Sequence, residues 1–206
     1  MGLGLDIADI LDDVGSSFSI LTRDPVVSGE KLLFSINLRA SHPFLREHLR
    51  GGVFKSDTVV KNGDVINIAA VDQSFLVMSH APRSFENECF NYTSSLYRIN
   101  VSGELWAPSG ESEWSSNEYR KQTEFSLKHS TVYGLFSEAL SGVGFDENQE
   151  FVEVYQGNNE MYIPDIYDIQ PNDRYVPTSG EYYRVTGIRK RRFHGIDIAF
   201  LEIDRR

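Results

Sequence analysis

The chain has 206 residues, with 20 Lys and Arg against 30 Asp and Glu, and its formal net charge is −10. This acidic balance argues against broad binding to duplex nucleic acid, because only a concentrated cationic surface neutralises phosphates. A hydrophobic content of 40%, with 12% aromatic residues, is sufficient to build globular cores.

Membrane insertion and secretion are not expected from this sequence. No apolar run approaches the roughly 20 residues that cross a bilayer. The first residues lack the basic start and the cleavage site of a signal peptide. We therefore expect a globular protein that is made and kept in the cytoplasm, or assembles from there, without a membrane partner.

An amphipathic helix is predicted to open the chain. Apolar residues at helical spacing share one face: Leu3, Ile7, Ile10, Leu11 and Val14. Aspartates occupy the rest of the helix: Asp6, Asp9, Asp12 and Asp13. Gly15 is placed to end it. We favour packing of this helix on its own module over docking on a neighbouring subunit.

Short strands are predicted to follow the helix. Apolar and polar side chains alternate over residues 32–38, which is typical of a half-buried strand, and a further strand is expected over residues 18–22. Residues 43–50 predict a helical turn that ends at Gly51 and Gly52.

A pattern of turn and strand occurs twice in the chain. Each copy has an aspartate, an aromatic residue ten or eleven positions later, and a valine two positions after that: Asp64, Phe75 and Val77 in the first, Asp173, Tyr183 and Val185 in the second. Turn-forming residues precede each aspartate, and alternating strand patterns follow it. This repeat indicates two related β modules.

The predicted fold is mainly β, with two small β-barrel-like or β-sandwich modules and a short N-terminal helix. Residues 108–121 are polar and rich in turn formers, which favours a linker or exposed loop. We therefore predict an N-terminal module over residues 1–107 and a C-terminal module over residues 122–206. Further strands are expected within 122–155, most clearly at Phe151, Val152, Val154 and Tyr155.

No catalytic or metal-binding pattern was found. The five histidines form no closely spaced pair, and the single cysteine excludes an intrachain disulfide and a multi-cysteine metal site. Cys89 is flanked by carboxylates that oppose a reactive thiolate, so we interpret it as a buried, inert thiol. We expect a protein that is not an enzyme and that has no cofactor and no metal site.

A basic run stands out against the acidic background: Arg189, Lys190, Arg191 and Arg192. We predict that it forms the tip of a hairpin, where loops usually carry recognition. Two interpretations remain open, a solvated tip and a contact with an acidic partner. The helix aspartates supply a complementary surface, and head-to-tail contacts between subunits can close into rings.

Two segments near the C-terminus carry a resemblance. They read Asp-Ile-Gln-Pro-Asn-Asp-Arg at residues 168–174 and Tyr-Tyr-Arg-Val-Thr-Gly-Ile at residues 182–188, and a hairpin and a final apolar strand follow. This pattern resembles the C-terminal half of small head-tail connector proteins of tailed bacteriophages, in which a return strand closes a compact β-barrel. Those connectors commonly have one barrel, whereas this chain is about twice as long, and Asn172 stands where their turn usually has Gly.

The resemblance implies a structural protein of the virion neck, assembled in the host cytoplasm and without enzymatic activity. Such a protein forms a ring between the portal of the head and the tail, as a stopper that helps close the head after genome packaging or as an adaptor. Its partners would be copies of itself, portal or adaptor proteins, and tail proteins. Contact with packaged DNA is left open.

Two alternatives remain at this stage. One is a ring of the tail-terminator or tail-completion type. The other, from a different class, is a β module that binds a small ligand or carbohydrate, with Trp106, Trp114 and Tyr119 and the loop carboxylates as its site.

Overall fold

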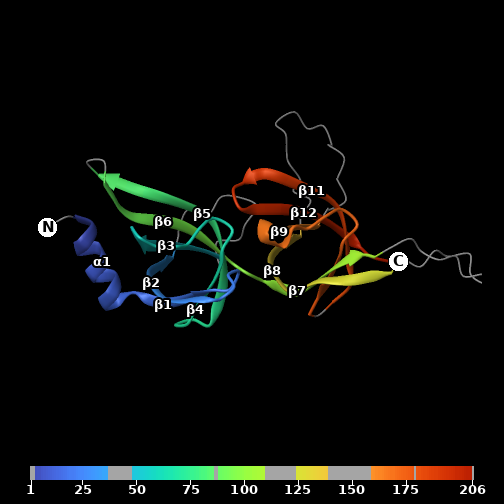
Figure 1. Ribbon diagram of the computed structural model, residues 1–206, viewed down its shortest axis with the longest axis horizontal. Helices are drawn as coiled ribbons and strands as arrows, with labels where there is room; N and C mark the ends of the chain where they lie inside the picture. Colours follow the sequence, from blue (N-terminus) through green and yellow to red (C-terminus); the bar gives the residue numbers. More distant parts are fainter. Residues whose placement is uncertain are drawn as a thin grey trace, which may run out of the picture.

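The structure is a computed structural model that describes residues 3–36, 48–85, 88–109, 124–138, 159–178 and 180–205. The described residues form one α-helix, α1 (Leu3–Val14), and twelve strands. The strands make two closed antiparallel barrels that lie one after the other along the long axis of the molecule (Figure 1). The predicted fold class, two barrel-like β modules with a short N-terminal helix, is confirmed.

The first barrel follows α1. Its strands are β1 (Ser16–Ile20), β2 (Val27–Ile36), β3 (Leu49–Lys55), β4 (Val65–Ile68), β5 (Gln73–Phe85) and β6 (Glu88–Arg98). They are hydrogen-bonded in the order β1-β2-β3-β6-β5-β4, and β4 closes the barrel on β1. Gly51 and Gly52, where we expected a helical turn to end, lie inside strand β3. That prediction is wrong for the residues that the structure describes.

The second barrel repeats this topology. Its strands are β7 (Val101–Pro108), β8 (Phe125–Glu138), β9 (Asn159–Pro164), β10 (Arg174–Pro177), β11 (Tyr183–Phe193) and β12 (Ile196–Ile203), with a 3-10 turn, η2 (Asp165–Tyr167), after β9. The order β7-β8-β9-β12-β11-β10 matches that of the first barrel, strand for strand. The strand expected at Phe151, Val152, Val154 and Tyr155 lies outside the described residues. The chain is a tandem repeat of one six-stranded barrel.

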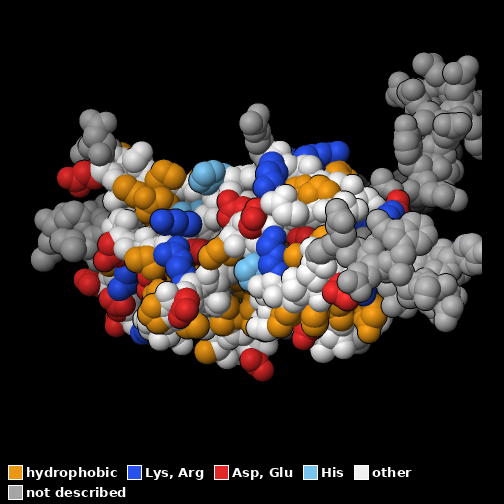
Figure 2. Space-filling model, turned by 45° about the vertical axis from the view of Figure 1, so that its right-hand side comes forward, with side chains coloured by type: hydrophobic (Ala, Val, Ile, Leu, Met, Phe, Trp, Pro, Cys, Tyr) orange, Lys and Arg blue, Asp and Glu red, His pale blue; other side chains and the backbone are white. Residues whose placement is uncertain are grey.

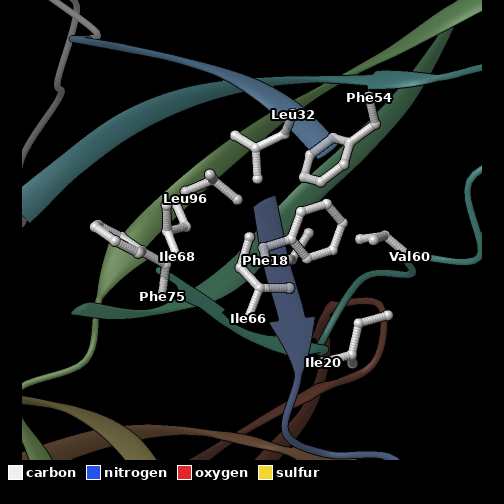
Figure 3. Packing of buried hydrophobic residues seen from close by; sticks show 10 residues of the cluster. Phe18, Ile20, Leu32, Phe54, Val60, Ile66, Ile68, Phe75 and Leu96 are labelled. Carbon is white, nitrogen blue, oxygen red and sulfur yellow. The ribbon is translucent and has the colours of Figure 1, made fainter. Parts of the chain in front are cut away.

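Each barrel has its own apolar core. In the first, side chains from several strands converge on its axis, and the ring of Phe18 meets that of Phe54 edge-on at 5.4 Å (Figure 3). The second core has Tyr175, Val185 and Leu201 at fully buried positions. Along each strand, successive side chains point alternately into the barrel and away from it.

The repeated turn seen in the sequence has the same structure in both barrels. The carboxylate of Asp64 accepts the backbone N–H of Lys61 at 2.8 Å, and that of Asp173 accepts the N–H of Gln170 at 2.9 Å. The residue before each aspartate adopts a left-handed conformation, with φ of 85° at Gly63 and 74° at Asn172. Asn tolerates this region better than most residues, so Asn172 substitutes for Gly here.

The boundary between the modules differs from our prediction. Strand β7 belongs to the second barrel, where it pairs with β8 and β10, so the barrels meet at Ile99 and Asn100 and not after residue 107. Pro108 still pairs with Phe125, which makes residues 109–124 a connection within the second barrel. The polar stretch 108–121 is therefore not an inter-module linker, although residues 110–123 lie outside the described part of the chain.

An apolar junction joins the two barrels. It combines residues of the first barrel with residues of the second: Val65, Leu76 and Met78 with Leu135, Tyr162, Ile196 and Ile198. At its edge the turns at Gly63 and Gly195 meet backbone to backbone. A Cβ atom at Gly195 would lie 2.3 Å from the carbonyl oxygen of Asn62, and one at Gly63 would lie 2.0 Å from that of Gly195. Both positions therefore require glycine.

We expect Gly195→Ala to lower the free energy of unfolding by about 2 kcal/mol or more, because the residue has φ of 75° and no space for a methyl group. Gly187→Ala is the matched control on the preceding strand, since its Cβ would meet only the Phe200 ring at an ordinary 3.6 Å. That variant should stay within about 0.5 kcal/mol of wild type. Urea unfolding followed by circular dichroism measures both, and equal stabilities would contradict the proposed junction.

Candidate functional site

The basic run lies in a strand and not at a hairpin tip. Strand β11 continues to Phe193, and the turn to β12 is made by His194 and Gly195. Arg189, Lys190 and Arg192 are exposed on this strand, while the side chain of Arg191 lies outside the described part. The prediction of a hairpin tip is wrong because pairing with β12 continues past the cations. Arg189 pairs with Ile198, the register then shifts, and pairing resumes between Phe193 and Ile196.

The three described cations have different neighbours. The guanidinium carbon of Arg189 lies 5.1 Å from the centroid of the Phe200 ring, and that of Arg192 lies 5.5 Å from the centroid of Phe193. Such cation-π contacts contribute about 0.5–1 kcal/mol at exposed sites. The ammonium group of Lys190 lies 3.6 Å from Oδ2 of Asp197. Among the ion pairs of the described residues, none involves Arg189 or Arg192.

Beside the basic strand lies an open hollow. It is lined mainly by Asp165, Lys190, Phe193, His194 and Asp197. Asp197 is only 4% exposed, and burial raises the pKa of its carboxyl group, an effect that nearby Lys190 opposes and Asp165 reinforces. The described residues contain no cluster of three or more His, Cys, Asp or Glu side chains that could hold a metal ion. We interpret the Asp197–Lys190 pair as a tie between β12 and β11.

The acidic helix is fixed to its own barrel. Leu11 is fully buried, and α1 packs on β2, β3 and β6. Asp12 forms an ion pair with Lys55 at 2.6 Å, and its backbone carbonyl accepts a hydrogen bond from Lys31. The hydrogen bond to Asp12 raises the pKa of the Lys55 ammonium group. Packing on the helix's own module is thus confirmed, and Asp12 is already paired.

The outer face of α1 is the part of the helix that remains available. We define it by Asp9, Ile10, Asp13 and Val14, all of which are exposed. The side chain of Asp6 lies outside the description. In Figure 1, α1 is at one end of the molecule, whereas β11 belongs to the other barrel, so the two charged surfaces do not meet within one chain. Figure 2 shows acidic side chains at the left-hand end of that face, and basic and acidic ones side by side across its middle.

Sequence reasoning missed a third surface, the end row of the second barrel. It is a line of residues that face one another across neighbouring strands β7, β10, β11 and β12: Trp106, Arg174, Arg184 and Glu202. Leu127 on β8 extends the row beyond Trp106. Only the strand pairing of the second barrel reveals this surface, because its members are far apart in the sequence.

The end row contains two ion pairs of different character. Nε of Arg174 lies 2.7 Å from Asp204, whose side chain is almost fully buried, and the ring of Phe125 covers the guanidinium group at 3.8 Å. Arg184 and Glu202 form a more exposed pair at 3.1 Å. The first pair is a structural element, while the second, being more exposed, contributes at most about 1 kcal/mol to stability.

Two other predictions concern binding and reactivity. Trp106 donates its indole N–H to Glu104 at 2.9 Å, and Trp114 and Tyr119, the other aromatic residues of the expected ligand site, lie outside the described residues. Cys89 is exposed near the end of the β5–β6 hairpin, so the prediction of a buried thiol is wrong. The hairpin extends beyond the barrel, which leaves this segment without a covering layer.

No helix in the described parts of the chain has the length and apolar character needed to cross a membrane. Comparisons with family models, with curated proteins and with solved structures found no match to this chain.

Asp197→Asn should raise the free energy of unfolding at pH 7. Burial raises the pKa of Asp197 above its unfolded value, so ionisation at neutral pH opposes folding, and the neutral amide removes this cost. The gain should disappear as the pH falls towards about 4, where the unfolded carboxyl group also binds a proton. Thermal unfolding between pH 4 and pH 8 checks both points.

Glu181→Gln is the control, because it removes one negative charge at an exposed position that takes no part in the pKa shift of Asp197. It should change stability little at any of these pH values. A destabilised Asp197→Asn protein at pH 7 would show that the ionised pair with Lys190 outweighs the cost of burial.

Proposed function

We propose that this protein is a structural component of the neck of a tailed-phage virion. In this proposal it forms a ring that joins the portal of the head to the tail and helps close the head after genome packaging. The observation that carries the proposal is the position of the resembling segments. Residues 168–174 form the turn that leads into β10, and residues 182–188 lead into and form most of the first half of β11, in a compact closed barrel.

The first copy of the motif supports the same interpretation. Asp64 and Asp173 make the same turn, and Val77 and Val185 each donate a backbone N–H to the carbonyl of that aspartate at 2.9 Å. The connector-like element is therefore present once in each barrel. A chain with two such barrels suits a role as a spacer in a ring stack, where each barrel can contact a different neighbour.

The charged surfaces are suited to assembly. The basic strand has two exposed guanidinium groups, on Arg189 and Arg192, that are not neutralised by an ion pair among the described residues. The chain as a whole carries a net charge of −10, so a local cation surface attracts acidic proteins, including other copies of this chain. We assign this strand to a contact with an acidic partner in the particle.

Reversal of the basic strand should impair particle assembly. In the variant Arg189→Glu/Arg192→Glu, acidic groups would face an acidic partner, and we expect a loss of several-fold or more in the yield of tailed particles. The effect should also depend on salt, since exposed charges are screened over about 8 to 10 Å at physiological ionic strength. Particles are counted by electron microscopy after complementation of a strain that lacks the gene.

The control is Lys61→Glu/Arg83→Glu, which changes the net charge equally at exposed positions of the first barrel. It should assemble normally, and circular dichroism should show that both variants are folded. A normal yield from the folded Arg189→Glu/Arg192→Glu protein would exclude the basic strand as an assembly contact. A neck complex that lacks the protein altogether would exclude the proposed function.

The purified protein should be a monomer at micromolar concentration. Its copies repel one another through their net charge, and ordering long side chains costs roughly 0.5 to 1.5 kcal/mol each, so a ring needs the template of its partner. Light scattering with and without the partner ring measures this. A stable ring in the absence of the partner would contradict the requirement for a template.

A further inference from the structure

The internal repeat shows how one barrel of this chain binds another. A row of apolar residues on the first barrel faces the second: Leu21, Val65, Leu76 and Tyr97. These residues lie opposite one another across β4, β5 and β6, and Leu21, just after β1, donates its backbone N–H to Val65. The row packs on residues of strands β8, β9 and β12.

The end row is the counterpart of this apolar row on the second barrel. Arg174 of β10 corresponds to Val65 of β4. Arg174 lies opposite Arg184 and Trp106; likewise, Val65 lies opposite Leu76 and accepts the backbone N–H of Leu21. Glu202 lies opposite Arg184, as Tyr97 lies opposite Leu76. The second barrel thus presents outward the surface through which the first barrel binds its neighbour, in a more polar form.

On the first barrel, helix α1 covers the strands that are equivalent to those covered by the first barrel on the second. Strands β2, β3 and β6 of the first barrel correspond in order to β8, β9 and β12 of the second. The first set is covered by α1, and the second is covered by the first barrel. If a second copy continued the same stacking, the end row of one copy would therefore meet α1 of the next.

The two surfaces match in chemistry. On the outer face of α1, Ile10 is 52% exposed and Val14 is 68% exposed, and Asp9 and Asp13 lie beside them. Around the end row, Leu127 is 48% exposed and Tyr182 is 53% exposed, next to Arg184, whose side chain is 39% exposed. Apolar groups can therefore face apolar groups, while the aspartates reach a guanidinium group. Tyr, Trp and Arg are also the residue types most enriched at protein interfaces.

We propose that the end row of the second barrel binds the outer face of α1 in a second copy of this chain, head to tail. Closure of these contacts into a ring rests on the proposed function, whereas the contact itself follows from the internal repeat. The charged residues Arg174, Arg184 and Glu202 replace apolar residues of the junction, so this contact is weaker than the one between the barrels. Copies therefore associate reversibly and strongly only at high local concentration.

Cysteine cross-linking tests the contact on the purified protein. In a Cys89→Ser background, Ile10→Cys protein is mixed with Leu127→Cys protein of different tag size and oxidised at high protein concentration. We expect the yield of the mixed dimer to be several-fold higher than in a control in which Val71→Cys protein replaces the Leu127→Cys protein. Val71 is exposed on the first barrel, away from the end row. Equal yields with the control, or only dimers of identical chains, would overturn the proposal.

A charge exchange provides the second readout. Adding Asp9→Lys/Asp13→Lys to the Ile10→Cys protein should lower the yield several-fold, and Arg184→Glu in the Leu127→Cys partner should restore it in part. Failure of both effects in folded proteins would exclude the proposed pairing of charges. Because these assays need no virus particle, a negative result here is distinguishable from failure of the neck function, which only the particle experiments test.

Discussion

The contact between Gly63 and Gly195 at the barrel junction determines how the rest of the molecule is arranged. Interfaces between domains of one chain usually permit relative motion unless they are large and apolar. Here an apolar cluster from both barrels is combined with an approach of two backbones that leaves no space for a Cβ atom. Two barrels held in this way act as one body, so α1 and the end row are fixed at opposite ends. In a ring or stack built from such a unit, the junction would set the distance between the two contact surfaces of each copy.

The two copies of the barrel have kept similar interiors and acquired different exteriors. Inward positions match in kind, as with Val77 and Val185 or Leu96 and Leu201. Outward positions differ: Leu76 corresponds to Arg184 and Tyr97 to Glu202. A core tolerates only apolar residues of suitable volume, whereas an outer face is determined by what it contacts. The second barrel therefore presents a more polar outer row than the first.

The sequence predicted local features well and long-range pairing poorly. The aspartate turn was visible because its hydrogen bonds connect residues three positions apart. In both copies an aromatic residue follows, with a valine two positions later. The module boundary was misplaced because β7 pairs with β10, far along the chain, while a conspicuous polar stretch at 108–121 attracted the assignment. The end row could not be predicted, since its members come from four strands whose register only the fold reveals.

The basic strand illustrates why one pattern can have two physical explanations. Pairing of β11 with β10 ends at Arg184, and pairing of β5 with β4 ends at Leu76, so in the described structure each continuing strand has a free edge. Natural proteins protect such edges with proline or with charge.

Pro82 on β5 corresponds to Lys190 on β11. Pro82 pairs with Tyr92 of β6, and Lys190 lies close to Asp197 of β12, the strand equivalent to β6. Protection of an edge works with charge of either sign, whereas attraction of an acidic partner requires positive charge. Glutamate at Arg189 and Arg192 would leave the edge protected and remove the attraction. The sign of the charge on β11, and not its presence, is therefore what distinguishes a solvated edge from a site of assembly.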